Sequence, residues 1–333
     1  MRKIGIKRSL IVLFLIISFY FSGCSRKKVY GEEIAEWQIQ RFDTDLYAYL
    51  LSEDSSVFNE INRPFLDQLG VNVIYIGASD SAGFKERLKN YFAELTLRNL
   101  YEDEQEKMKD ITSVNKELAY GMETLLMNFP SLKRPRVYMH VSGLNQNIVV
   151  SENILSLSAD KYMGADYPLY QDFFYEYQRQ LMTPDRIVPD YLLGFMMANF
   201  PFKGNDEILL DKILYEGKLR YILSLLLPER KVWEYVGYSE EQYRWCINHE
   251  TKIWTSILEN KHLFTPDYRI AERYIRPAPY TAFLPIEAPG RVGVWLGFRI
   301  VGSYMKNHPH TSLLELMEVI DYNELLKKAK YRP

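Results

Sequence analysis

Apolar residues recur with the period of an α-helix along most of this chain, and the densest such run lies in residues 186–221. Two helices are predicted there, one on each side of the polar turn P-F-K-G-N. The first is almost wholly apolar, and the apolar face of the second is interrupted by Glu216 and Gly217. A buried carboxylate needs a partner, and a glycine inside a helix indicates that something packs close to it. The sequence therefore predicts close packing around these two residues.

The same spacing predicts further helices, at residues 84–100, 104–129, 239–260 and 292–305, with a strongly aromatic helical segment from residue 168 onward. In the third of these, Ser239 is the expected N-cap, with Gln242 completing a capping box.

Strand patterns are rarer. Residues 136–157 are the one clear sheet region, with strands expected around residues 137–141, 148–150 and 154–157, while residues 71–76 fit a strand or a loop edge. A small sheet followed by a helical majority indicates an α+β fold, mostly helical.

The N-terminus has the pattern of a secreted lipoprotein. Four basic residues precede an apolar run over residues 10–21, which is too short to span a bilayer and typical of a signal peptide. The run ends in F-S-G-C, which resembles a bacterial lipobox, where the leader is cut before the cysteine and Cys24 is lipidated. We expect residues 1–23 to be the signal peptide, 24–36 a lipidated tether and 37–333 one domain. An uncleaved membrane anchor is the alternative.

Composition excludes some functions. After cleavage the chain keeps Cys24, the expected lipid site, and Cys246, so no intrachain disulfide is expected. The formal net charge is −2 and no long basic block follows the N-terminus, which argues against a nucleic-acid partner.

The histidines do not form a zinc motif. The only His-Glu pair is His249-Glu250, and Ile253 stands where a zinc-binding helix needs its second imidazole. His308 and His310 flank a proline and fit a solvated loop better than a metal site. No metal and no other cofactor is predicted.

Asp160, Lys161 and Tyr162 form a polar trio directly after a predicted strand, where side chains can line a cleft. A lysine or tyrosine there could bind a peptide carbonyl or carboxylate, while a solvent-exposed turn with an internal ion pair is the alternative. For Glu216 a structural salt bridge is favoured over catalysis, with Lys161, Arg291 or Arg299 as the cation. The predicted cleft residues are therefore Asp160, Lys161, Tyr162, Glu216 and Arg291.

Several motifs occur in a fixed order from residue 41 to the C-terminus: R-F-D-T-D-L, L-S-A-D-K-Y-M-G, L-L-D-K-I-L-Y-E-G-K, W-C-I-N-H-E-T-K-I-W and P-G-R-V-G-V-W-L-G-F-R-I-V-G-S-Y-M. In this order the chain resembles the gliding-motility lipoprotein GldB family of Bacteroidetes envelopes. The resemblance implies a protein that is anchored in the envelope by a lipid and works beside gliding or secretion machinery.

That family is in turn similar to predicted zincin peptidases, which have H-E-x-x-H, a later E-G and a later glycine-spaced helix. The E-G corresponds to Glu216-Gly217, and the glycine-spaced helix to Gly293 and Gly297. The histidine helix falls near residues 189–194, where this chain has P-D-Y-L-L-G and lacks both histidines. The resemblance thus implies a zincin-like α+β domain without a catalytic metal.

We therefore expect a non-catalytic accessory or scaffold protein that binds polypeptide. It would be lipid-anchored in the cell envelope, on the periplasmic face of the outer membrane, with protein partners there. The alternatives are a degenerate zincin-like metallopeptidase and a structural lipoprotein with no cleft function.

Overall fold

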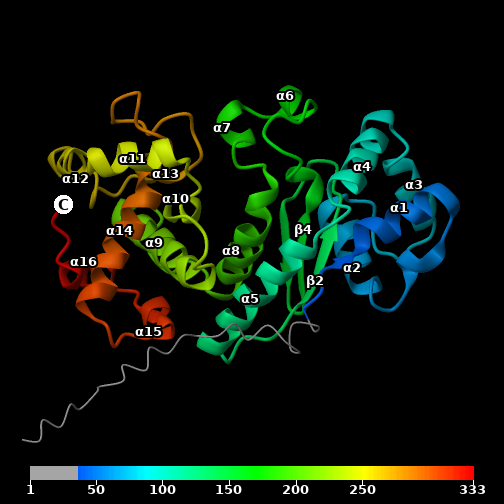
Figure 1. The fold of residues 1–333 in the computed structure, drawn as a ribbon, viewed down its shortest axis with the longest axis horizontal. Coiled ribbons are helices and arrows are strands. Elements are labelled where there is room, and N and C mark those ends of the chain that lie inside the picture. Colours follow the sequence, from blue (N-terminus) through cyan, green and yellow to red (C-terminus); the bar gives the residue numbers. More distant parts are fainter. Residues whose placement is uncertain (1–36) are drawn as a thin grey trace, which may run out of the picture. The chain divides into compact units, whose positions relative to one another are not determined.

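The computed structural model describes residues 37–333, and these belong to one compact unit (Figure 1). The predicted signal peptide, the predicted lipid site Cys24 and the tether lie outside the described residues. Within the described part of the chain, no helix combines the length and the apolar character needed to cross a membrane.

A four-stranded sheet has the order β1-β2-β4-β3. Strands β1 (Gln40–Arg41), β2 (Arg136–His140) and β4 (Ile154–Ser158) run parallel, and β3 (Ile148–Ser151) lies antiparallel to β4 at one edge. The three longer strands confirm the predicted sheet region. The first strand was not predicted, because two residues carry no measurable alternation.

Helices cover both faces of this sheet (Figure 1). Tyr138 packs with α1 (Phe42–Ser52), α2 (Arg63–Gln68) and α3 (Phe84–Tyr91), whereas Met139 packs with α5 (Thr112–Asn128) and α8 (Ile187–Asn199). Consecutive side chains of a strand point to opposite faces, so neighbouring residues of β2 belong to two different cores. All five residues of β4 are buried, as expected for a strand covered on both sides.

The second half of the chain is helical and is built around α9 (Leu209–Leu226) and α14 (Val292–Asn307). A Cβ atom added at Gly297 would lie 1.7 Å from the carbonyl oxygen of Ile213, and one added at Gly217 would lie 2.2 Å from the carbonyl carbon of Gly297. The two backbones therefore touch where these glycines meet. This confirms the close helix contact predicted from the sequence.

The remaining α-helices are α4 (Leu95–Lys107), α6 (Tyr170–Phe173), α7 (Glu176–Arg179), α10 (Val232–Tyr235), α11 (Glu240–Asn248), α12 (Glu250–Glu259), α13 (Tyr268–Ile275), α15 (Leu313–Glu318) and α16 (Tyr322–Ala329). Together with the small sheet they confirm the mostly helical α+β fold.

Several predicted elements differ from the structure, and the aromatic segment from residue 168 forms two short helices, α6 and α7. The helix expected at residues 239–260 is broken at His249 into α11 and α12. The His249 ring stacks on Trp245 at 4.2 Å between centroids, and its Nδ1 lies 2.8 Å from the Trp245 carbonyl oxygen, so the ring competes locally with the helix. The capping box of Ser239 and Gln242 at the start of α11 is confirmed.

Three more differences concern the first half of the chain. The helix expected at 104–129 is interrupted, because α4 ends at Lys107 and α5 begins at Thr112. Residues 71–76 form no strand: Leu69–Val73 is a π-helical turn, and the Gly70 carbonyl accepts from the amides of Ile76 and Gly77. The helical stretch expected at 84–100 is interrupted after α3, because Glu94 caps a new helix by accepting from the amide of Leu97 at 3.0 Å.

Candidate functional site

A cleft of about 870 Å³ is lined by residues that come after the sheet in the sequence. Its lining residues come from three stretches that are distant in sequence, namely residues 165–186, 230–242 and 277–291. Because Arg186, Arg230 and Arg291 all line it, we call it the arginine cleft.

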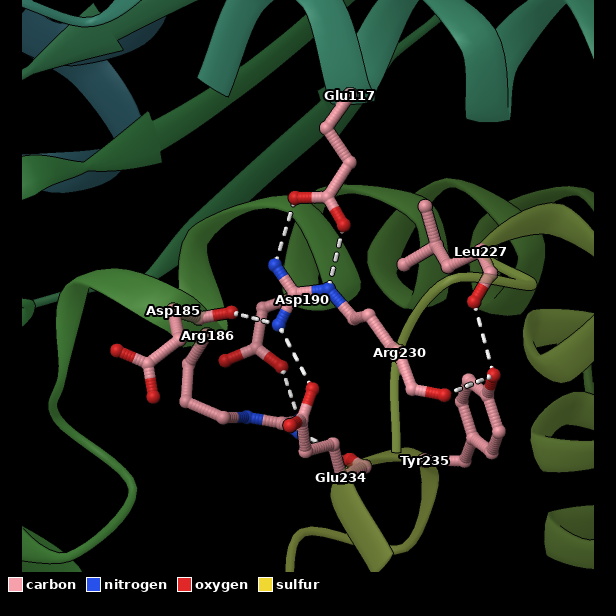
Figure 2. A network of polar contacts seen from close by, with 8 residues as sticks. All are labelled: Glu117, Asp185, Arg186, Asp190, Leu227, Arg230, Glu234 and Tyr235. Carbon is pink, nitrogen blue, oxygen red and sulfur yellow. Dashed lines mark hydrogen bonds and ion pairs between the residues drawn. The ribbon is translucent and has the colours of Figure 1, made fainter. Parts of the chain in front are cut away.

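Arg186 lies at the start of α8 and binds two elements at once (Figure 2). Its Nη2 donates to Asp190 Oδ1 at 2.7 Å, and its Nη1 donates to the carbonyl oxygen of Glu234 at 2.7 Å. The hydroxyl of Tyr162 donates to the second oxygen of Asp190 at 3.0 Å. This set of bonds ties α8 to α10 and to the segment that follows β4.

Arg230 connects the cleft to α5, one of the helices that cover the sheet (Figure 2). Its Nε and Nη2 donate to the two carboxylate oxygens of Glu117, on α5, at 2.5 and 2.7 Å, and its Nη1 donates to the carbonyl oxygen of Asp185 at 2.7 Å. Burial alone would lower the pKa of Arg230, but the hydrogen bonds and charge of Glu117 raise it above the usual value. The bidentate pair fixes this wall of the cleft.

A second buried pair lies on α9. Arg220 Nη2 donates to Glu216 Oε2 at 3.0 Å, and the two side chains are only 8% and 14% exposed. Burial lowers the pKa of Arg220 to about 10, Glu216 opposes this, and the charges of Arg291 and Arg186 lower it further. Three guanidinium groups therefore lie within electrostatic reach of one another.

The predicted salt bridge of Glu216 exists, but the predicted cations, Lys161, Arg291 and Arg299, are wrong. The partner is Arg220, because a residue four positions along a helix lies over the same face and needs no distant element to reach it. Arg299 pairs instead with a carboxylate on α12 at 2.9 Å.

Asp160 lies in the buried connection after β4 and is fully buried. It accepts from the backbone amides of Ser142 and Leu144, at 3.2 and 2.6 Å, and from the hydroxyl of Ser158. Burial raises the pKa of Asp160, and these hydrogen bonds oppose the rise. Its role is to hold the loop after β2, and it does not line the arginine cleft.

Lys161 serves the same loop. Its Nζ donates to the carbonyl oxygens of Leu144 and Asn145, at 3.2 and 3.3 Å, and lies 4.7 Å from the ring centroid of Phe174. Asp160 and Lys161 are both buried, so the alternative of a solvent-exposed turn is wrong. Of the predicted cleft residues, Arg291 lines the arginine cleft and Tyr162 is bonded, through Asp190, to Arg186.

Arg291 differs from the other arginines of the site. It is the N-cap of α14, has a φ of 66°, and its side chain forms no hydrogen bond or ion pair with any residue in 37–333. A Cβ atom added at Gly237 would lie 3.3 Å from Arg291 Nη1 and 3.9 Å from Arg186 Nη1. Two guanidinium groups thus approach the same glycine.

Sequence reasoning missed Arg186, Asp190, Arg220, Arg230 and Glu234. A signal was present, since each of the three arginines has an acidic residue four positions away on the same helical face or turn. No such signal existed for the carboxylate on α5, which is 113 residues from its arginine.

No group of three or more His, Cys, Asp or Glu side chains in the described residues is arranged to hold a metal ion. The stretch P-D-Y-L-L-G lies in α8, where Pro189 and Leu193 are buried. His140 is buried on β2, with its Nδ1 2.7 Å from the Ser156 hydroxyl, and burial lowers its pKa to about 3.

Comparison with known proteins gives a family match. Residues 24–333 match the family described as gliding motility protein GldB. No curated protein and no solved structure matches the chain. The matched stretch contains every described residue of the fold and the arginine cleft. The chain therefore belongs to the gliding motility protein GldB family, a family of envelope lipoproteins.

Proposed function

We propose that this protein is a non-catalytic accessory protein that binds a polypeptide of the gliding or secretion machinery in the arginine cleft. Lipid on Cys24 holds it at the periplasmic face of the outer membrane, after removal of residues 1–23, and residues 24–36 tether a single domain.

The observation that carries this proposal is the fixed position of the arginines at the cleft, which are held by carboxylates that do not themselves line it. Asp190 is bonded to Arg186, Glu216 to Arg220 and Glu117 to Arg230. Arginines fixed in this way present directed hydrogen-bond donors to a ligand, which suits recognition.

The walls of the cleft suit a peptide. Tyr175 and Tyr177 line it with their rings stacked at 5.7 Å between centroids, and Pro277 and Pro279 line it from another stretch. Tyrosine and arginine are enriched at binding surfaces, because they offer large contact areas and directed hydrogen bonds. A volume of about 870 Å³ accommodates a short extended segment.

The degenerate-peptidase alternative has no observation in its favour. Pro189 and Leu193 occupy α8 where the resemblance expects histidines, and Glu216 is bonded to Arg220. Similarity to zincins remains a prediction from the sequence.

Site-specific photo-crosslinking in intact cells tests the proposal. We expect p-benzoylphenylalanine at Gln180, an exposed cleft residue, to give one predominant adduct with an envelope protein. The same probe at Met127, which is exposed on α5 and outside the cleft, is the matched control and should not give that adduct. Cys24→Ala should reduce the adduct by releasing the protein from its membrane. Identical adducts from both positions, or none from position 180, would contradict the proposal.

A further inference from the structure

Arg186, which lines the cleft, and Arg220, which lies outside its lining, have hydrogen-bond donors that nothing in the described chain uses. Arg220 Nε and Nη1 and Arg186 Nε are buried and have no partner among the described residues. Their side chains are 8% and 11% exposed. Buried N–H groups are almost always bonded, because each one left unpaired loses its hydration without compensation. These donors indicate a missing acceptor.

The charges around these donors are also unbalanced, because arginines outnumber the carboxylates bonded to them. Arg186, Arg220 and Arg291 lie close together, and within the described residues the carboxylates bonded to them are those of Asp190 and Glu216. Arg291 contributes a whole guanidinium without a partner in residues 37–333. Like charges in a partly buried site repel each other strongly, since solvent screens them little. An anion between them would relieve this repulsion.

Arg291 is also held firmly in place. Its φ of 66° is unusual for a residue with a side chain, and such strain is concentrated at ligand-binding positions. Tyr238 fixes the preceding residue by donating to the Gly290 carbonyl oxygen at 2.7 Å. Thr281 fixes the following one by accepting from the Val292 amide at 3.1 Å. The guanidinium therefore extends from a fixed backbone, next to the positive end of α14.

Carboxylates line the cleft as well, but they do not cancel the positive electrostatic field of the arginines. Glu176, Asp185 and Glu241 are exposed, and Glu234 is within 3.5 Å of Arg230. Exposed charges are screened by water and salt, whereas the half-buried arginines are screened much less. The cleft thus combines partly buried arginines with acidic residues that are exposed to solvent.

We infer that Arg291 and Arg186 form an anion subsite that binds a carboxylate of the polypeptide in the arginine cleft. The guanidinium fork matches a carboxylate with paired, charge-assisted hydrogen bonds. Two sources have this chemistry: an acidic side chain and the C-terminus of the bound chain. The inference rests on the proposed function and specifies which group of the partner the cleft recognises.

Short synthetic peptides with a neutral fluorophore test this on the full-length protein in detergent, by fluorescence polarisation. The peptides share one Ala/Ser sequence and differ in a central Glu or Gln and in a free or amidated C-terminus. We expect at least one carboxylate-bearing peptide to bind about tenfold more tightly than the Gln amide. The peptide that binds more tightly shows whether the carboxylate comes from a side chain or from the C-terminus. Arg291→Gln should remove the gain, because this side chain supports no other described contact.

Arg269→Gln is the matched control, since Arg269 is 86% exposed on α13 and outside the cleft; it should keep the gain. Equal affinity of all the peptides for the wild type would overturn the inference but leave peptide binding intact. A gain that survives Arg291→Gln would also overturn it. If no peptide binds, the carboxylate subsite is wrong, while the cross-linking result still decides the proposed function.

Discussion

Gly297→Ala should lower the free energy of unfolding by about 4 kcal/mol, a larger loss than most single substitutions cause. The added methyl group would lie 1.7 Å from the carbonyl oxygen of Ile213, which belongs to the backbone of α9 and cannot rotate away. The two central helices would have to separate, and their separation would open the backbone contact between α9 and α14. Urea denaturation of the full-length protein, followed by circular dichroism, measures the loss.

Gly302→Ala provides the control in the same helix. A Cβ atom there meets nothing within 4 Å, and alanine favours a helix over glycine, so stability should rise by about 1 kcal/mol. Similar stabilities for the two variants would show that α9 and α14 are not in backbone contact at Gly297.

Glu216→Leu should cost about 3 kcal/mol, because it leaves the guanidinium of Arg220 buried without its carboxylate. The neighbouring charges of Arg186 and Arg291 make that loss worse. Glu216→Gln should be milder, since the amide oxygen still accepts the hydrogen bond. Thermal and urea unfolding of the three proteins measures these differences.

Two controls separate the ion pair from other effects. Adding Arg220→Leu to Glu216→Leu should recover much of the lost stability, because no buried cation then remains. Glu240→Leu breaks an i, i+4 pair on α11 whose arginine is 69% exposed, and it should change stability by less than about 0.5 kcal/mol. A Glu216→Leu variant as stable as the wild type would remove the structural role assigned to this pair.

Much of the fold could be predicted because its main elements are long and periodic. Helices α8, α9 and α14 and strands β2 and β4 follow from spacing alone. The failures have tertiary causes. The break at His249 depends on its ring stacking over Trp245, and the two-residue strand β1 exists only because β2 lies beside it.

Residues of the site could be predicted only where they stand out from their neighbours in the sequence. Glu216 and Gly217 stood out because both are unusual inside an apolar helix, and the structure gives them an ion pair and a backbone contact. Asp160 and Lys161 are polar residues used to hold a loop, which a sequence pattern does not distinguish from cleft residues. The arginine cleft joins three distant stretches of chain, so only the folded structure brings its residues together.

The most direct test of binding without catalysis is mass spectrometry of peptides incubated with the full-length protein. Proteolytic peptides of envelope proteins from the same cells would be incubated with it, with and without added zinc, and the protein-bound fraction recovered. We expect acidic peptides to be retained and recovered uncleaved under both conditions. Cleavage that stops with a chelator and is lost in Glu216→Gln would contradict it.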